Sequence, residues 1–266
     1  MMPVRLRRAA TFSVAFSWLC VTASPPSAAA EAMPKDFVYL ADIDPTIQQD
    51  MRYAGAANFT GNPVPGYDGR ECVLVRQAAE ALKRVQEAVR TKGLSLKVYD
   101  CYRPARAVAS FVDWAKTPDD PKAKMIYYPN LMKSALFPDY IATRSSHSRG
   151  ATMDLTLVPL SPSGSDGESN GDTNQAPCTA TQAKSAPDGS LAMGTTFDCF
   201  DLKSHTIVPG LSDEERANRE TLIEAMAAEG FKNYPKEWWH FTLEGEPYPD
   251  TIFDFPIEPR ISDDKG

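Results

Sequence analysis

The segment SSHSRGATMDLTL, residues 145–157, carries the clearest structural signal in the sequence. From residue 151 onward Ala, Met and Leu alternate with Thr and Asp, which is typical of a β-strand with one face on a core. Asp154 then projects from the other face, toward a cleft or solvent. Gly150 permits a tight bend that would return His147 to the side of Asp154. Such a pair can bind a divalent metal, although a capped loop before a solvated aspartate has the same spacing.

Regular elements are also predicted on the N-terminal side of this strand. Apolar residues at 75, 78, 82, 85 and 89 recur with helical spacing, and Gly93 supplies a stop. Residues 94–99 favour a short strand, and Pro104 interrupts regular pairing, so a new helix can begin near Ala105. Arg103 is therefore expected at the end of a strand.

A further helix is predicted on the C-terminal side. Ser212 is followed three residues later by Glu215, a capping-box sequence, and apolar residues continue the pattern to Gly230.

The strand at 151–158 needs partners from elsewhere in the chain. We therefore predict one α+β domain over residues 31–266, in which helices flank a small antiparallel sheet that carries the site.

Residues 160–191 differ in composition from the rest of the chain. They are rich in Ser, Gly, Asp, Asn, Pro, Thr and Gln and contain hardly any aliphatic side chain. Such a segment cannot bury enough surface to offset the entropy lost on ordering. We predict a flexible surface insertion here.

The N-terminus has the pattern of a cleaved export signal. Three arginines within residues 1–8 precede an uncharged apolar stretch at 9–23 and a run of small residues that ends at Ala30. The apolar stretch is shorter than the roughly 20 residues that span a bilayer. We predict a signal peptide over residues 1–30, a periplasmic or secreted mature protein, and no membrane attachment after cleavage.

The overall composition excludes some partners. The chain has 266 residues, of which 42% are hydrophobic and 24% charged, as expected for a soluble globular protein. Without residues 1–30, 25 basic and 35 acidic residues remain, a net charge of −10. No stretch dense in Lys or Arg follows the first eight residues, so nucleic acid is not an expected partner. The oligomeric state is not predicted.

Four cysteines remain once Cys20 is removed with the signal. An even number in an exported protein permits disulfides, and three pairings are possible. We favour Cys178 with Cys199, because a bridge would tether the flexible insertion. Cys72 and Cys101 both adjoin apolar stretches and are either buried thiols or a second bridge.

A second polar group lies in the segment EWWHF, residues 237–241. The aromatic side chains would place Glu237 and His240 in a low-dielectric setting, where each needs a partner. Together with His147 and Asp154, His240 would complete three metal ligands and leave a fourth position for water, as in catalytic zinc sites. Glu237 could then act as general base.

The spacing of this segment raises a difficulty. Aromatic content favours a strand, in which residues three apart point to opposite faces, yet the proposed roles need Glu237 and His240 on one side. Either a bend intervenes or Glu237 approaches from the edge of the strand. An aromatic core strand with one hydrogen-bonded histidine is the simpler alternative.

Several motifs, taken in order along residues 37–256, resemble the zinc D-alanyl-D-alanine dipeptidases known from vancomycin resistance. The resemblance implies that His147, Asp154 and His240 bind one Zn²⁺ per chain and that Glu237 is the catalytic acid and base. His205 has no ligand role in this pattern. The motifs are DMRY (50–53), NFTG (58–61), YRP (102–104), SSHSRGATMD (145–154), MGTTFD (193–198), EWWH (237–240), PY (247–248) and DFP (254–256).

The resemblance also implies roles for Arg103 and Asp198. Arg103 matches the family arginine that stabilises the charged transition state, and a guanidinium fixed beside a proline suits that task. Asp198 matches the acid that receives the free ammonium of the substrate. The simpler alternatives are a surface salt bridge between Arg103 and Asp100, and a turn role for Asp198.

The implied activity is hydrolysis of the small dipeptide D-Ala-D-Ala by metal-activated water. The long insertion at 160–191 departs from the family pattern and lies just before Asp198, so it bears on substrate selectivity. An exported enzyme would meet dipeptide released from the cell wall, which favours wall turnover or scavenging over antibiotic resistance. The alternatives are a D,D-carboxypeptidase acting on longer wall peptides and a noncatalytic wall-peptide binding protein.

Overall fold

The computed structural model describes residues 31–160, 176–180 and 188–260. The predicted signal at 1–30 and most of the predicted insertion lie outside these residues. The α-helices are α1 (Leu40–Ile43), α2 (Arg76–Arg90), α3 (Ala105–Ala115), α4 (Pro121–Tyr127) and α5 (Asp213–Ala228). The 3₁₀ turns are η1 (Arg52–Ala54), η2 (Lys133–Ala135), η3 (Ser146–Arg149) and η4 (Leu202–Ser204). The strands are β1 (Phe37–Tyr39), β2 (Gln48–Gln49), β3 (Val73–Val75), β4 (Leu94–Asp100), β5 (Thr152–Pro159), β6 (Phe231–Asn233) and β7 (His240–Leu243).

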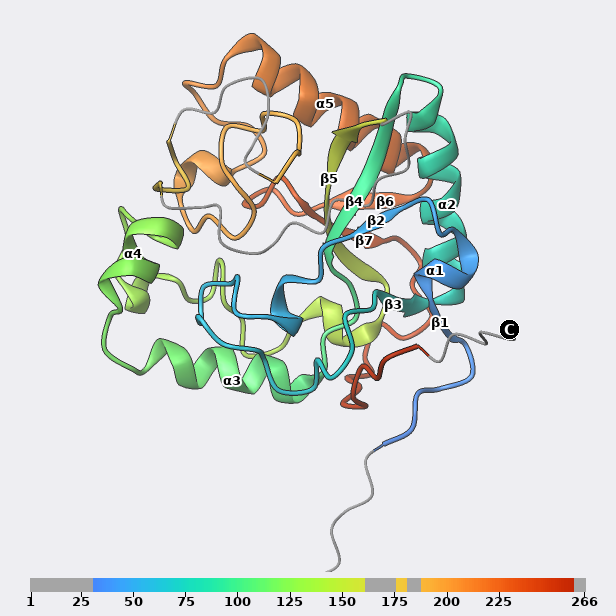
Figure 1. Cartoon of the computed structure of the whole chain (residues 1–266), viewed down its shortest axis with the longest axis horizontal. Coiled ribbons are helices and arrows are strands. Elements are labelled where there is room, and N and C mark those ends of the chain that lie inside the picture. Colours follow the sequence, from blue (N-terminus) through green and yellow to red (C-terminus); the bar gives the residue numbers. More distant parts are fainter. Residues whose placement is uncertain (1–30, 161–175, 181–187, 261–266) are drawn as a thin grey trace, which may run out of the picture.

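A five-stranded sheet in the order β2-β4-β5-β7-β6 forms the centre of the fold (Figure 1). All neighbours in it are antiparallel except β2, which adds to β4 in parallel. β1 and β3 form a separate antiparallel pair. The predicted α+β class and the small sheet are thus confirmed, with one short parallel strand at the edge.

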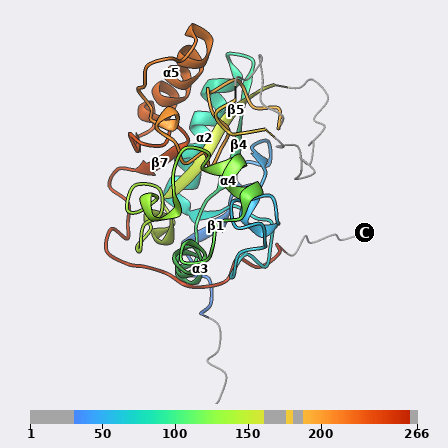
Figure 2. The ribbon, with the colours of Figure 1, turned by 90° about the vertical axis from the view of Figure 1, so that its left-hand side faces the viewer.

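The register of β4 and β5 divides the sheet into two faces. Leu96 pairs with Leu157 and Val98 with Leu155, and all four side chains are fully buried in the hydrophobic core. Helices α2 and α5 pack against each other and against these strands on one side of the sheet, whereas α4 lies on the opposite side of the molecule from α2 (Figures 1 and 2). Asp154 lies on the face opposite the leucines, because side chains alternate along a strand.

An irregularity in β4 changes which side chains reach that second face. The register shifts between Val98 and Asp100, so Asp100 pairs with Asp154. A bulge of this kind lets two consecutive residues of one strand oppose a single residue of the next. The bulge therefore places the Asp100 carboxylate beside Asp154.

The helices predicted from periodicity and capping are confirmed to within one or two residues. In α5 the Ser212 hydroxyl accepts a hydrogen bond from the Glu215 N–H, and the Glu215 carboxylate accepts one from the Ser212 N–H. The predicted strand at 151–158 is β5, but its second face is also buried, so Asp154 faces a cleft and not solvent. No helix within the described ranges is long and apolar enough to cross a bilayer.

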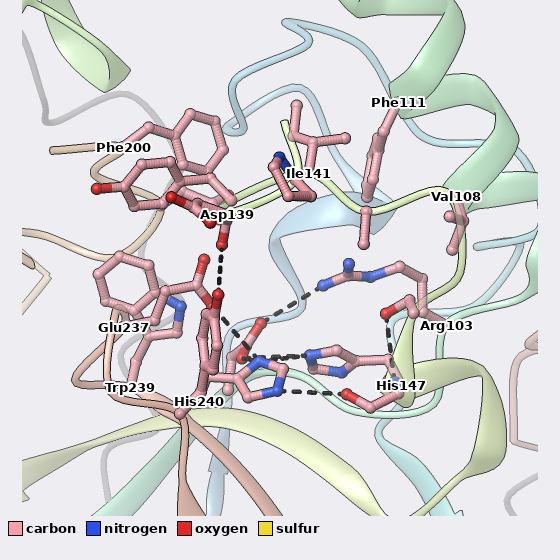
Figure 3. A pocket seen from close by; sticks show the side chains of 18 of the residues that line it. Arg103, Val108, Phe111, Asp139, Ile141, His147, Phe200, Glu237, Trp239 and His240 are labelled. Atoms are coloured by element: carbon pink, nitrogen blue, oxygen red, sulfur yellow. Dashed lines mark hydrogen bonds and ion pairs between the residues drawn. The ribbon is translucent and has the colours of Figure 1, made fainter. Parts of the chain in front are cut away.

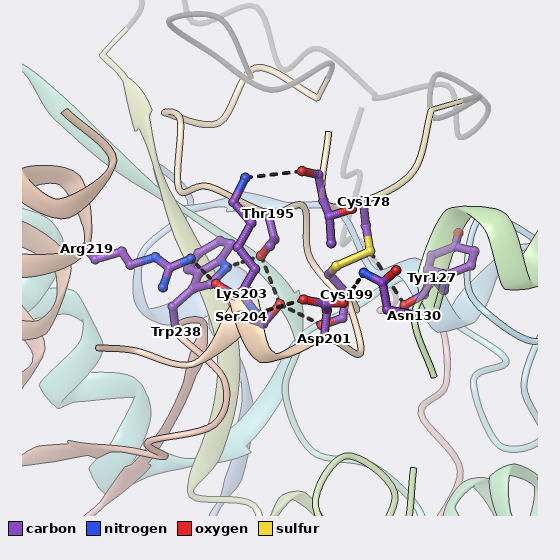
Figure 4. Close-up of a disulfide and its surroundings, with 11 residues drawn as sticks. Tyr127, Asn130, Cys178, Thr195, Cys199, Asp201, Lys203, Ser204, Arg219 and Trp238 are labelled. Carbon is purple, nitrogen blue, oxygen red and sulfur yellow. Dashed lines mark hydrogen bonds between the residues drawn. A yellow bond between two sulfur atoms is a disulfide. The ribbon is translucent and has the colours of Figure 1, made fainter. Parts of the chain in front are cut away.

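Two disulfides occur in the described part of the chain. The favoured pair, Cys178–Cys199, is confirmed (Figure 4). Cys72 and Cys101 form the second bridge, which was one of the two alternatives left open for them.

The C-terminal end of the predicted insertion is held against β4. The Asp188 carboxylate pairs with Arg52 at 3.0 Å and accepts a hydrogen bond from the Tyr99 hydroxyl at 2.6 Å. The Lys97 ammonium donates to the Asp188 carbonyl at 2.5 Å. The Tyr99 ring in turn stacks on Phe197, with ring centroids 4.5 Å apart. These contacts position the chain directly ahead of Asp198.

Candidate active site

A pocket of about 340 Å³ opens on the second face of the sheet. Figure 3 shows Glu237, Trp239 and His240 on one side of it and Arg103 on the other, with apolar side chains such as Phe111 above them. All six residues implicated from the sequence as ligand, catalytic or substrate-binding groups line this pocket.

His147 lies in η3, directly before β5. The Ser145 side chain accepts a hydrogen bond from the His147 N–H and caps the turn. Gly150 ends the turn with φ of 82°, and a Cβ at this position would come within 2.2 Å of the Phe37 ring. The predicted bend is confirmed, and both the positive φ and the close approach require glycine.

Strand pairing brings His240 to the same place. Asp154 on β5 lies directly opposite His240 on β7, so the two side chains share a face of the sheet. Asp154 Oδ1 is 3.1 Å from His240 Nδ1 and 3.3 Å from His147 Nε2, and these two nitrogens are 3.2 Å apart. The structure thus brings the three predicted ligands together, with one donor atom of each within 4.8 Å of the others.

The surroundings of the two imidazoles direct their lone pairs toward Asp154. His147 Nδ1 lies 2.7 Å from the Cys101 carbonyl, which only accepts, so in the neutral imidazole Nδ1 carries the proton and Nε2 has the lone pair. His240 Nε2 lies 3.3 Å from the Ser146 hydroxyl, which can accept its proton and leave Nδ1 free. Asp154 Oδ1 accepts no hydrogen bond within the described chain. Three electron-rich atoms facing one another in a buried position fit a divalent cation.

Glu237 lies in a turn ahead of β7. Its N–H donates to the Tyr234 carbonyl at 3.1 Å, and the His240 N–H donates to the Glu237 carbonyl at 3.3 Å. The strand therefore begins only at His240, and a strand over the whole of 237–241 is wrong. Of the two alternatives, the bend is correct, and it brings Glu237 Oε2 to 3.5 Å from His240 Nδ1. Pro235 explains the late start, because proline cannot donate to a strand ladder.

Arg103 reaches the pocket from the segment between β4 and α3. Its guanidinium is 2.7 Å from the Asp100 carboxylate and 3.5 Å from Asp154 Oδ2. It also lies 5.2 Å from the ring centroids of both Tyr53 and Phe111. The pairing with Asp100 considered from the sequence does exist, but it is buried and holds the guanidinium inside the pocket.

Asp198 combines a turn conformation with a place in the pocket. It has a φ of 59°, the left-handed region that Asp tolerates better than most residues. Its carboxylate is buried and accepts hydrogen bonds from the Tyr53 hydroxyl at 3.0 and 3.1 Å. Asp198 is therefore a turn residue whose side chain faces the site.

The buried part of the pocket carries an excess of negative charge. The carboxylates of Asp154, Asp198 and Glu237 line the pocket, Asp100 lies behind Arg103, and each of the four residues is at most 8% exposed; Arg103 is paired with Asp100 and Asp154. Burial and the charge of Asp154 raise the pKa of Asp198 to about 8. Burial, with Asp154 and Asp198, raises the pKa of Glu237 well above its ordinary value. Burial also acts to raise the pKa of Asp154, but the two imidazoles, when protonated, outweigh it and leave that pKa lowered.

Three residues of the site were not predicted from the sequence: Tyr53 and Arg144 line the pocket, and Asp100 lies behind Arg103. Asp100 enters through the bulge, which has no sequence signature. Tyr53 is the last residue of the DMRY motif, so the motif was a signal for it. Its hydroxyl donates a hydrogen bond to Asp198. Arg144 lines the pocket, is exposed and has no partner among the described residues. His205 contacts the Tyr140 hydroxyl at 3.2 Å and is not part of the metal-binding group.

An α+β domain with a buried His/Asp/His group at the base of an open pocket, next to a buried glutamate, defines a metal-dependent hydrolase. The chain belongs to the D-ala-D-ala dipeptidase family, whose model matches residues 33–163 and 173–258. It is therefore a metallopeptidase. The unmatched residues 164–172 lie within the segment predicted to be an insertion.

Curated relatives support this assignment over most of their length. A D-alanyl-D-alanine dipeptidase of Streptomyces coelicolor is 40% identical over 227 residues, which are 85% of this chain and 100% of the relative. One of Enterococcus faecium is 37% identical over 84% of this chain and 98% of the relative. One of Escherichia coli is 29% identical over 78% of this chain and 84% of the relative.

Proposed function

We propose that this chain is an exported zinc dipeptidase that hydrolyses D-Ala-D-Ala to two molecules of D-alanine. The observation that carries the proposal is the charge of the buried pocket. When all its carboxylates are ionised, the group around Arg103 has three uncompensated negative charges. A divalent metal and the free ammonium of a dipeptide together bring three positive charges. The relatives of Enterococcus faecium and Streptomyces coelicolor are D-alanyl-D-alanine dipeptidases, which supports the same substrate.

The donor set favours zinc. Two imidazole nitrogens and one carboxylate oxygen, with room left for water, are typical of catalytic zinc sites, whereas Mg²⁺ and Ca²⁺ prefer oxygen ligands. His147, Asp154 and His240 would hold the ion. Zn²⁺, when bound, acts as a Lewis acid and lowers the pKa of a neighbouring water molecule to near 7.

Glu237 and Arg103 would carry out the remaining chemistry. Glu237 would accept a proton from the attacking water and deliver it to the nitrogen of the departing D-alanine. A nearby cation would counter the negative charges that raise its pKa, and so favour the ionised form that a base requires. Arg103, already held by Asp100 at 2.7 Å, would stabilise the oxyanion that forms on the peptide carbonyl without having to reorganise.

The two ends of the dipeptide would be recognised by opposite charges. Asp198, oriented by the Tyr53 hydroxyl, would accept the ammonium. The carboxylate needs a cation that is not already paired. Arg103 is paired with Asp100, and Arg149 is paired with Glu246 at 2.7 Å. Arg144 has no such partner within the described chain, so we assign the carboxylate to it.

An oxidising compartment agrees with this proposal. The two disulfides are the kind of crosslink that persists in exported proteins and is rare in the cytosol. They support the predicted signal over residues 1–30, and with it a role in wall turnover or scavenging. Sequencing the N-terminus of the mature protein from the periplasm or medium tests this point, because export predicts a start close to residue 31.

Zinc content and D-alanine release test the activity itself. The wild-type protein should hold one zinc per chain and release D-alanine from D-Ala-D-Ala. Glu237→Gln, which keeps the shape of the side chain, should retain zinc and lose turnover by about 10³-fold. His240→Ala should lose both zinc and turnover. Unaltered turnover in Glu237→Gln would contradict the proposed mechanism.

A blocked substrate separates the alternatives. N-acetyl-D-Ala-D-Ala lacks the ammonium, so a site that depends on Asp198 should reject it. Hydrolysis of the blocked peptide at the rate of the free dipeptide would instead indicate a D,D-carboxypeptidase. Zinc-loaded protein that hydrolyses neither would indicate a noncatalytic wall-peptide binding protein.

A further inference from the structure

The Cys72–Cys101 disulfide is joined to the candidate metal centre through one backbone segment. The Cys101 carbonyl accepts the hydrogen bond from His147 Nδ1 at 2.7 Å, which sets the tautomer and the rotation of that imidazole. The Arg103 N–H donates to the His147 carbonyl at 3.3 Å. Segment 101–103 and His147 thus contact each other through two hydrogen bonds.

This segment has little regular structure of its own. β4 ends at Asp100 and α3 begins at Ala105, so residues 101–103 lie between elements. Their anchors include the disulfide to Cys72, a hydrogen bond from the Tyr102 N–H to the Val73 carbonyl at 2.9 Å, and one from the Tyr102 hydroxyl to the Phe255 carbonyl at 3.0 Å. The disulfide is therefore a covalent link between this segment and Cys72, the residue before β3.

The same segment controls Arg103 as well as His147. Asp100, the residue before Cys101, holds the Arg103 guanidinium at 2.7 Å, and its Oδ2 also lies 3.5 Å from His147 Nδ1. A shift of Cys101 would therefore move the acceptor of His147 and the partner of Arg103 together. Both cysteines are fully buried, so the crosslink lies within the core that supports the site.

We propose that the Cys72–Cys101 disulfide is a positioning element for His147 and Arg103, and that it raises the affinity of the site for metal. The proposal rests on the ligand role assigned to His147 in the proposed function. A disulfide with a purely structural role would change the stability of the fold but not the affinity of the folded protein for zinc. Affinity is therefore the quantity to measure.

The second disulfide provides a matched control. Cys72–Cys101 and Cys178–Cys199 span 29 and 21 residues, so their removal should release similar unfolded-state entropy and lower the Tm by similar amounts. Cys178 contacts the Tyr127 carbonyl at 3.6 Å, and neither Cys178 nor Cys199 lines the pocket. Cys199 adjoins Asp198, so the control can alter KM for a dipeptide while it leaves zinc affinity unchanged.

The experiment compares Cys72→Ala/Cys101→Ala with Cys178→Ala/Cys199→Ala in the full mature chain. Zinc affinity is measured by competition with a chelator, well below the Tm of each variant. We expect about a tenfold or greater loss of affinity in the first variant, as for loss of other groups that orient a ligand, and less than a twofold change in the second. Zinc affinity in Cys72→Ala/Cys101→Ala within twofold of wild type would overturn the proposal.

Two further measurements keep the test decisive. In metal-free protein, the His147 Nδ1 proton should give a hydrogen-bonded NMR signal in wild type and control that is weakened or lost without Cys72–Cys101.

If the first variant does not fold, wild-type protein is titrated with dithiothreitol and alkylated. Zinc release should then follow modification of Cys72 and Cys101; release that follows Cys178 and Cys199 instead would overturn the inference. Wild-type protein that binds no zinc would refute the proposed function itself, a result distinct from all of these.

Discussion

Replacing Asp198 with asparagine tests the charge balance of the pocket, because it removes one buried carboxylate and keeps the shape of the side chain. In metal-free protein the pKa of Asp198 is raised to about 8 by burial and by Asp154, compared with about 3.9 for an unfolded chain. Between these values the folded chain holds a proton that the unfolded chain has released. Asp198 therefore contributes stability that is present at low pH and is lost as pH rises.

The size of the effect follows from the number of protons involved. A difference of one bound proton corresponds to about 1.4 kcal/mol per pH unit. From pH 5 to pH 7, wild-type protein should lose about 3 kcal/mol of unfolding free energy relative to Asp198→Asn. Glu237, whose pKa burial raises, acts in the same direction in both proteins, and His240, whose pKa burial lowers, acts in the opposite direction. Comparing the two proteins largely removes both contributions.

Urea unfolding of chelator-treated protein at pH 5, 6 and 7, followed by tryptophan fluorescence, measures this difference. Asp113→Asn is the control, because it removes an exposed carboxylate outside the pocket. Saturating zinc should stabilise wild-type protein more at pH 7 than at pH 5, since the cation offsets the ionised carboxylates. An Asp198→Asn protein whose stability differs from that of wild type by the same amount at pH 5 and pH 7 would refute the reasoning.

Three further substitutions probe separate parts of the site. Gly150→Ala should lower the unfolding free energy in urea by about 2–5 kcal/mol, because the left-handed backbone and a Cβ 2.2 Å from Phe37 both oppose it; wild-type stability would exclude the tight bend. Arg144→Gln should raise KM for D-Ala-D-Ala by about tenfold or more with kcat nearly unchanged, since the lost contact stabilises the bound substrate and the transition state equally; steady-state kinetics with an unaltered KM would place the carboxylate elsewhere. Arg103→Lys should lower kcat by about 10²-fold or more with zinc content unchanged, because a lysine ammonium cannot reproduce the two contacts that the Arg103 guanidinium makes with Asp100. Full activity would remove Arg103 from the mechanism.

Much of the scaffold could be predicted because it follows from local periodicity. The alternation in β5 identified the face of Asp154, and the capping box located the start of α5. These signals lie within a few residues of the features that they predict. The position of His147 could also be predicted, because Gly150 marks the bend that returns it to β5.

The remaining features depend on tertiary structure. A bulge in β4 brings Asp100 beside Asp154 and Arg103, and bulges carry no fixed residue pattern. The relation between Glu237 and His240 stayed open because the aromatic residues between them favour a strand, whereas Pro235 favours the turn that forms. Likewise, the pairing of Cys72 with Cys101 depends on the contact between β3 and the segment after β4, which spacing along the chain does not reveal.

The excess of buried negative charge in the pocket can also account for the choice of substrate. On the proposed function, zinc neutralises two of the three uncompensated charges, and one carboxylate, Asp198, remains for the substrate. A free dipeptide supplies an ammonium at that point, but an N-acylated wall peptide supplies none and leaves a buried charge unpaired. Breaking a buried ion pair costs about 3–5 kcal/mol, which corresponds to a loss of about 10²–10³-fold or more in kcat/KM. Longer wall peptides would therefore be excluded because they leave Asp198 unpaired, even where the pocket has room for them. Asp198→Asn should bring the kcat/KM values of free and acetylated dipeptide closer together, chiefly by lowering kcat/KM for the free dipeptide.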